Sequence, residues 1–381
     1  MIQVRTAVID FVLQITLKLL RAVRLNREEM SEDSKEEIDT LFWKRRWIIG
    51  TVTALVVLVS SLIFYFSSMW TNFLLETLEE TTILVPSLLI SSYLKYALDL
   101  KYRKVKTGYS GYARNSLSYL YIVIPFWVMS AAIILSFGRT YLTFLYLDLM
   151  LGVIITGLVV NIRVQIWKRS SKEISNSRII EGAKRIAEKM GVEITGFREV
   201  NWSRAKIANA FQAGLRHRYV FVTNFMIDNL TEDEDLAIIA HEMAHAKMNH
   251  LTKTMVFVGI DLLLIGNALF AFIVFTLNYG AKLGLAFGIA ASVFVTAYIL
   301  LPILQRRFEM EADLIAATFT NPRLLADSLL KISRLNHTPI NIHWHWNPSH
   351  PSTSERIAYL KELENKEKDI NDGIGGRTTR T

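Results

Sequence analysis

Long apolar runs alternate with charged segments along this chain, and their lengths predict membrane-crossing helices. A transmembrane helix needs about 20 apolar residues, and six runs reach or approach that length. They are 47–66, 83–98, 117–137, 141–160, 255–277 and 283–304. The second run contains Pro86 and Lys95, but a lysine near a helix end can extend its amine to the membrane interface. The pattern predicts a mainly α membrane protein with about six transmembrane helices.

Lysine and arginine are concentrated in every second segment between these runs. The basic segments are 1–46, 101–114, 163–172 and 306–307, whereas 67–82, 138–140 and 278–282 hold one basic residue or none. With six spans, all the basic segments fall on the same side, which the positive-inside rule makes cytoplasmic. We therefore expect a multi-pass protein of the cell membrane.

Composition agrees with this prediction and narrows the chemistry. Hydrophobic residues make up 51% of the 381 residues, and the mean hydropathy of +0.27 is too high for an ordinary soluble protein. The formal charge of +8 does not predict nucleic-acid binding, because the basic residues lie at the ends of apolar runs. The chain has no cysteine, so any metal ion must be held by His, Asp or Glu.

The polar segment 163–254 has the periodicity of an α+β domain. A helical pattern over 177–190 is followed by Gly191, a residue type that commonly ends helices. Stretches rich in β-branched residues predict strands at 192–200 and 219–223. We expect these elements to form a cytoplasmic domain.

His241, Glu242 and His245 form the sequence H-E-x-x-H inside a predicted helix, which the capping box of Thr231 and Glu234 begins. Two imidazoles four residues apart stand one turn apart on the same helix face, where both can bind one zinc ion. Glu242 then lies beside the metal, where its carboxylate can take a proton from an attacking water. The motif therefore predicts a hydrolytic zinc site.

A catalytic zinc usually keeps three protein ligands, so a third ligand is expected later in the chain. The best candidate segment is 306–313, directly after the sixth apolar run, and it contains Glu309, Glu311 and Asp313. A transmembrane hairpin between the two segments would bring their cytoplasmic ends together. Glu309 and Asp313 are four residues apart, so one can reach the metal while the other holds a ligand imidazole.

Other polar or unusual segments have structural explanations. Asp148 and Asp261 lie within apolar runs, where a carboxylate is costly and often functional, but a protonated or paired carboxyl is the simpler explanation. His250 falls off the ligand face of the helix and is expected to be a surface histidine. The aromatic run 343–346 is expected to anchor at the membrane interface, and the polar tail 364–381 to be disordered.

The order of these motifs resembles the integral-membrane zinc metalloendopeptidases that include the HtpX-like heat-shock proteases and the type I CAAX prenyl proteases. Their pattern is H-E-x-x-H, then E-x-x-x-D after a membrane hairpin, and the similarity covers roughly 177–363. The resemblance makes Glu309, rather than Glu311, the third zinc ligand, and it gives Asp313 a supporting role. It implies a gluzincin-like peptidase domain with one zinc ion per chain.

Two more stretches are similar to elements of that family. The sequence A-N-A-F resembles its edge strand, which implies that Asn209 and Ala210 bind the substrate backbone by β-augmentation. The sequence H-P-S-T-S-E-R-I resembles an element near the active site, which implies that His350 or Arg356 could hydrogen-bond the oxyanion.

Three functions follow from these interpretations. The leading one is HtpX-like quality control, in which membrane or misfolded polypeptides are cleaved at the cytoplasmic face of the lipid bilayer. The alternatives are CAAX-type processing of defined or lipid-modified substrates, and a non-catalytic membrane scaffold, against which an intact Glu242 argues. The expected parts are an amphipathic and charged segment 1–46, four transmembrane helices in 47–162, peptidase parts 163–254 and 305–363 around a transmembrane hairpin 255–304, and the tail 364–381.

Overall fold

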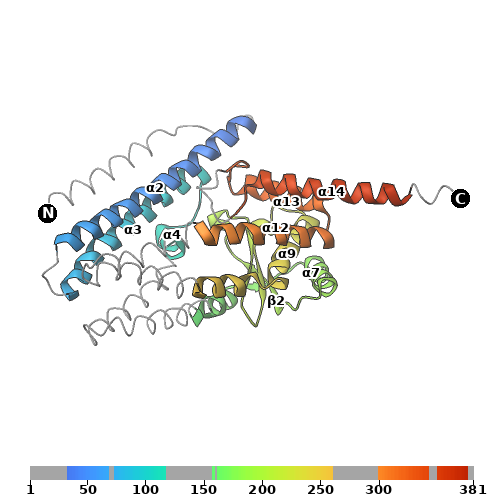
Figure 1. Ribbon diagram of the computed structural model, residues 1–381, viewed down its shortest axis with the longest axis horizontal. Coiled ribbons are helices and arrows are strands. Elements are labelled where there is room, and N and C mark those ends of the chain that lie inside the picture. Colours follow the sequence, from blue (N-terminus) through green and yellow to red (C-terminus); the bar gives the residue numbers. More distant parts are fainter. Residues whose placement is uncertain are drawn as a thin grey trace, which may run out of the picture. The chain divides into compact units, whose positions relative to one another are not determined.

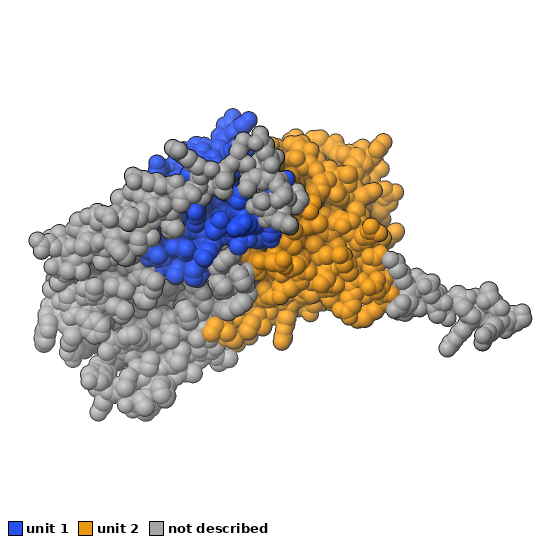
Figure 2. Space-filling view, turned by 90° about the horizontal axis from the view of Figure 1, so that it is seen from above, with its two compact units in different colours: residues 1–120, 204–206, 337–339 blue, residues 121–203, 207–336, 340–381 orange. Residues whose placement is uncertain are grey.

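The computed structural model of this chain, whose helices and strands are labelled in Figure 1, has two compact units. The first comprises residues 1–120, 204–206 and 337–339, and the second comprises 121–203, 207–336 and 340–381 (Figure 2). The residues that the structure describes are 32–67, 73–116, 157–158, 161–260, 299–342 and 350–375.

Much of the expected membrane region falls outside these described residues. The third run, the first 26 residues, the aromatic run 343–346, Asp148 and Asp261 all belong to that part of the chain. Within the described ranges, no helix has both the length and the apolar composition needed to cross a membrane. The six spans therefore stay a prediction.

Helices α2 (Glu32–Ser67), α3 (Phe73–Arg103) and α4 (Tyr109–Ser116) belong to the first unit. Phe42 of α2 stacks on Tyr102 of α3, with ring centroids 4.5 Å apart. Asp99 of α3 is almost fully buried, and it accepts hydrogen bonds from Arg46 at 2.6 Å and from Tyr112 at 2.7 Å. Because an unpaired buried carboxylate is costly, these two donors make its burial tolerable.

Both ends of the described chain are more helical than the sequence analysis expected. Helix α2 begins at Glu32, inside the segment 1–46 that was expected to be amphipathic and charged. Helix α14 (Thr353–Gly375) continues into the stretch 364–381 that was expected to be disordered. An ion pair between Lys366 and Glu362, one turn apart at 2.7 Å, is the kind of contact that supports a solvated stretch of helix.

The second unit contains a four-stranded sheet in the order β1-β2-β4-β3. Its strands are β1 (Lys172–Glu173), β2 (Gly196–Val200), β3 (Ala210–Ala213) and β4 (Tyr219–Thr223). Strand β2 is parallel to β4, while the β1–β2 and β3–β4 pairs are antiparallel. Strand β4 is buried along its whole length, and β3 lies at the edge of the sheet. The strand expected at 219–223 is confirmed, and the one expected at 192–200 is confirmed from residue 196.

The remaining described elements are α7 (Ser177–Met190), η3 (Ser203–Ala205), α8 (Asn224–Ile227), α9 (Glu232–Lys247), α12 (Leu301–Phe319) and α13 (Pro322–Leu335). Helix α9 packs against α7, α12, α13 and strand β3 (Figure 1). Gly182 makes the close approach of α7 possible, because a Cβ there would lie 2.6 Å from Leu236 of α9. Ile239 and Met243 of α9 are fully buried in the resulting core.

The local signals that end α7 and begin α9 are confirmed. Gly191 has the left-handed conformation, with φ of 64°, and its N–H donates to carbonyls in the last turn of α7. Thr231 Oγ1 accepts a hydrogen bond from the Glu234 N–H at 3.3 Å, and the Glu234 carboxylate accepts one from the Thr231 N–H at 2.7 Å. These caps fix where the helix carrying the H-E-x-x-H sequence starts.

Asp235, in the first turn of α9, supplies a testable pH dependence. The side chain is fully buried, and neither carboxylate oxygen has a hydrogen-bond partner among the described residues. Burial, with repulsion from Glu234 and Glu232 that outweighs attraction from Lys331, raises the pKa of Asp235 to about 7. Because the unfolded chain would release this proton near pH ~4, folding stability should fall as pH rises from ~4 to ~7, by at most about 4 kcal/mol.

We therefore expect Asp235→Asn, which cannot ionise, to stabilise the protein more at pH 8 than at pH 5. The measurement is the apparent unfolding temperature of both proteins in detergent at the two pH values. The buried amide lacks partners as the protonated acid does, so only the pH-dependent part should change. An equal shift at both pH values would contradict the ionisation of this group.

Candidate metal centre and active site

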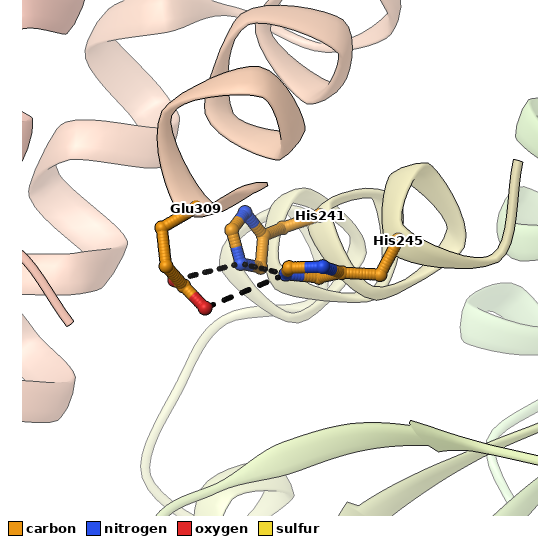
Figure 3. Close-up of side chains that lie close together, drawn as sticks. All are labelled: His241, His245 and Glu309. Atoms are coloured by element: carbon orange, nitrogen blue, oxygen red, sulfur yellow. Dashed lines mark hydrogen bonds and ion pairs between the residues drawn. The ribbon is translucent and has the colours of Figure 1, made fainter. Parts of the chain in front are cut away.

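Two histidines of α9 and one glutamate of α12 converge in the second unit (Figure 3). The Nε2 atoms of His241 and His245 lie 3.2 Å apart. The carboxylate oxygens of Glu309 lie 3.5 Å from His241 Nε2 and 3.6 Å from His245 Nε2. Donors at ordinary bond lengths around a tetrahedral zinc ion lie about 3.3 Å from one another. The spacing and the chemistry of these three donors therefore fit a zinc ion.

Asp313 lies one turn after Glu309 on α12 and holds the far side of the His241 ring. Its Oδ1 atom is 3.0 Å from His241 Nδ1, and its side chain is fully buried. Arg356 of α14 donates to both carboxylate oxygens of Asp313, at 2.7 Å and 2.6 Å, and lies 3.3 Å from Glu309. The guanidinium thus balances two buried carboxylates at once.

While no metal is bound, the pKa values of His241 and His245 are shifted in opposite directions. Burial and the nearby charge of Arg356 oppose protonation of His241, but hydrogen bonds to Asp313 and Glu309 outweigh them and raise its pKa to about 9. Burial and the charge of His241 lower the pKa of His245 to about 3. Burial would raise the pKa of Glu309, but its contacts with His241, His350 and Arg356 lower it well below the usual value. A metal ion binding here would displace the proton from His241.

Glu242 lies between His241 and His245 in sequence and faces strand β3 in space. One of its carboxylate oxygens accepts a hydrogen bond from the backbone N–H of Gln212 at 2.9 Å. Burial, and repulsion from Glu309, raise the pKa of Glu242 to about 7, although His241 and this hydrogen bond oppose the change. A carboxyl that exchanges its proton near neutral pH suits general acid–base chemistry. Gln212 could not be found from the sequence, because a backbone donor has no side-chain signature.

Strand β3 lies at the edge of the described sheet, beside Glu242. The N–H of Asn209 donates to Thr223 Oγ1 at 3.0 Å and its carbonyl accepts from the Thr223 N–H at 2.9 Å, so its backbone is already paired. Because alternate residues of a strand direct their backbone groups to opposite sides, those of Ala210 and Gln212 face away from β4. Within the described residues, β3 has a neighbouring strand on one side only.

His350 and Arg356 lie on the same side of the centre as Glu309. The Nδ1 atom of His350 is 3.1 Å from Glu309, and its side chain is half exposed, whereas Arg356 is almost enclosed. Arg306 donates to the carbonyl of His350 at 3.1 Å and to Glu355, which ties this segment to α12. All nine candidate site residues lie in the second unit: Asn209, Ala210, His241, Glu242, His245, Glu309, Asp313, His350 and Arg356.

The expectation that His250 is a surface residue is wrong. Its exposure is 3%, and its Nδ1 atom lies 2.8 Å from Nδ1 of His245. The expectation assumed that α9 continues, but α9 ends at Lys247, and Asn249 adopts the left-handed conformation with φ of 54°. That turn changes the direction of the chain and brings the His250 ring next to His245. The signal for it was Asn249 itself, because asparagine tolerates this conformation better than most residues.

Comparison with known proteins defines the class of this centre. Residues 173–364 match Peptidase family M48, and the chain belongs to this family. Its class is that of the zinc metalloproteases, and the residues that form the geometry described above all lie within the matched range.

Individual relatives are similar over part of their length. A "CAAX prenyl protease 1 homolog" of Oryza sativa subsp. japonica is 26% identical over 187 residues, covering 44% of this chain and 43% of that protein. The Homo sapiens protein of the same name is 28% identical over 153 residues, covering 35% and 31%. A "Protease HtpX homolog" of Campylobacter hominis is 28% identical over 187 residues, covering 42% and 66%. The matches thus span less than half of either prenyl protease homologue.

The fold has a solved counterpart. The crystal structure of S. mikatae Ste24p aligns with 93% of this chain and 96% of its own, with a TM-score of 0.62 and 16% sequence identity. At that identity the likeness establishes a shared, mostly helical fold and carries no conclusion about substrates.

Proposed function

We propose that this chain is a membrane-embedded, zinc-dependent endopeptidase that cleaves membrane or misfolded polypeptides at the cytoplasmic face of the bilayer. The observation that carries the proposal is the hydrogen bond from the Gln212 N–H to Glu242. It joins the candidate base to an edge strand whose remaining outward groups can pair with an extended peptide. A general base beside both a metal site and a peptide-binding edge suits the hydrolysis of polypeptides.

His241, His245 and Glu309 would hold the zinc ion, with Asp313 supporting His241. When bound, zinc would polarise the scissile carbonyl and increase the acidity of the attacking water. Glu242 would accept a proton from that water at its carboxylate and pass it to the leaving amine. In the metal-free protein, burial raises the pKa of Glu242 to about 7, which favours a carboxyl that can both accept and return a proton.

Strand β3 would align the substrate. The backbone groups of Ala210 face away from β4 and could pair with an extended peptide, while the exposed side chain of Asn209 lies next to it. His350 is the better placed of the two oxyanion candidates, since it is half exposed and Arg356 is already bound to Asp313. Negative charge developing on the substrate carbonyl oxygen would be stabilised by such a donor.

We infer the membrane arrangement from the sequence. Six spans with all the basic segments on one side would make the protein multi-pass and put the zinc domain in the cytoplasm. The zinc domain would consist of 163–254 and 305–363, joined by the transmembrane hairpin 255–304. Cleavage would then occur close to the bilayer surface.

A second candidate function is processing of a defined, lipid-modified substrate. It is favoured by similarity to two proteins named CAAX prenyl protease 1 homolog. A quality-control enzyme should cleave an unfolded protein such as casein, whereas a processing enzyme should cleave only a prenylated peptide ending in a CAAX sequence. Comparing the two substrates with the same zinc-loaded preparation separates the functions.

Metal removal tests whether peptide hydrolysis depends on zinc, as both candidate functions require. We expect chelation of the purified full chain to abolish cleavage, and one equivalent of Zn²⁺ per chain to restore it. Mg²⁺ and Ca²⁺ should not restore activity, because two imidazoles and one carboxylate are poor ligands for these oxygen-preferring ions. Cleavage that persists after the metal content falls below about a tenth of an equivalent would contradict a metallopeptidase.

A further inference from the structure

His250 occupies a buried position that the proposed mechanism leaves without a role. Its two ring nitrogens each have a partner: Nδ1 lies 2.8 Å from His245 Nδ1, and Nε2 lies 3.1 Å from a carboxylate oxygen of Glu311. The ring also stacks on Phe308, with centroids 4.1 Å apart and planes 8° from parallel. The ring is therefore held in one plane and one rotation.

The hydrogen-bond chain fixes where the protons lie. His245 turns Nε2 towards His241 and Glu309, so a metal would take that nitrogen and leave the proton on Nδ1. That N–H must donate to His250 Nδ1, so His250 carries its own proton on Nε2. The Nε2–H in turn donates to Glu311, a carboxylate that can only accept. Each donor in this series of hydrogen bonds thus meets an acceptor.

The two ligand histidines are supported in parallel ways. The Nδ1 atom of His241 faces Asp313 directly, while that of His245 reaches Glu311 through His250. Both carboxylates come from α12, which also carries Glu309. Residues two apart on a helix point in nearly opposite directions, so Glu311 is placed too far round α12 to act as Asp313 does. The His250 ring bridges the gap between His245 Nδ1 and Glu311.

We propose that His250, backed by Glu311, is a positioning residue that holds His245 in the tautomer and orientation needed to bind the metal. The inference rests on the proposed zinc site of the preceding section. A hydrogen-bonded partner on the far nitrogen of a ligand histidine typically changes metal affinity by about 10- to 100-fold. Loss of His250 should therefore change metal affinity without changing contacts with the substrate.

The test compares zinc release from the full chain in detergent. After loading with zinc, each protein is mixed with excess chelator and the dissociation rate is measured. We expect His250→Phe, which keeps an aromatic ring but cannot accept a hydrogen bond, to release zinc roughly 10- to 100-fold faster than wild type. His250→Gln should stay within a few fold, because its amide can accept from His245 and donate to Glu311. Cobalt-loaded His250→Phe should also show an altered visible absorption spectrum.

Two controls separate this role from packing. His217→Phe changes an exposed histidine before β4 and should leave zinc release unchanged. Phe308→Leu removes the stacking partner while keeping the hydrogen bonds, so its effect should be much smaller than that of His250→Phe. Glu311→Ala should accelerate release in the wild type but add little to His250→Phe, because the chain is already broken.

Each outcome bears on the inference. Release from His250→Phe at the wild-type rate, or equal acceleration by Phe308→Leu, would overturn it. If His250→Phe and His250→Gln were equally impaired, loss of folding rather than of the hydrogen bond would be responsible, and the inference would also fall. The proposed function is judged separately: zinc-loaded wild type that cleaves no substrate would refute the peptidase function while leaving the release rates interpretable. A wild type that binds no zinc would overturn both.

Discussion

Replacing Glu242 with glutamine is expected to lower peptide hydrolysis by about 10²- to 10⁴-fold while one zinc ion per chain is retained. The amide is nearly isosteric with the carboxylate and can still accept a hydrogen bond from the Gln212 N–H. It cannot accept a proton from the attacking water, and that transfer is the role we propose for this side chain. The three metal donors belong to other residues, so metal binding should be unaffected.

The measurement is zinc content and casein cleavage for the wild type and Glu242→Gln, purified side by side. A matched control is Glu188→Gln, the same substitution at an exposed glutamate of α7, which should leave both values unchanged. Cleavage by the zinc-loaded Glu242→Gln protein at more than about a tenth of the wild-type rate would exclude Glu242 as the base. Loss of zinc from that variant would show instead that Glu242 supports the metal.

Elements with local signals could be predicted from the sequence. The helix 177–190, its end at Gly191 and the capping box at Thr231 all agree with the structure. In each case the information lies within a few residues, as a capping side chain or a glycine that tolerates the left-handed conformation. Strand β4 was also predictable, because a short run of buried β-branched and aromatic residues has few alternatives.

Features that depend on contacts distant in sequence were harder to predict. The resemblance to a known family directed attention to Asn209 and Ala210, but propensity alone gave no reason for a strand there, and its edge position follows from the sheet order. The burial of His250 depends on the left-handed conformation of one residue, Asn249. The partner of His250, Glu311, lies 61 residues later in the sequence, on another helix. Helical periodicity indicates neither which strand lies at a sheet edge nor which distant residues pair. For this reason His250 was not expected beside the site.

Arg356→Met is expected to destabilise the metal-free protein by about 3–5 kcal/mol. Methionine can fill much of the space, but it leaves Asp313 and Glu309 buried without the guanidinium that balances them. Breaking a buried pair on one side is costly, because the remaining charge cannot regain its hydration. We expect a clear fall in the apparent unfolding temperature of the apo protein in detergent.

Zinc should offset part of this loss, which distinguishes the electrostatic role of Arg356 from packing. A divalent cation bound by Glu309 would supply positive charge close to both carboxylates, so zinc should raise the unfolding temperature of Arg356→Met more than that of the wild type. Arg306→Met is the matched control, because its partner Glu355 is half exposed and such surface pairs contribute about 0–1 kcal/mol. If both arginine variants lost the same stability, or if zinc stabilised Arg356→Met no more than the wild type, Arg356 would not be the counter-charge of this centre. Recovery of stability by adding Asp313→Asn to Arg356→Met would locate the cost in the uncompensated carboxylate.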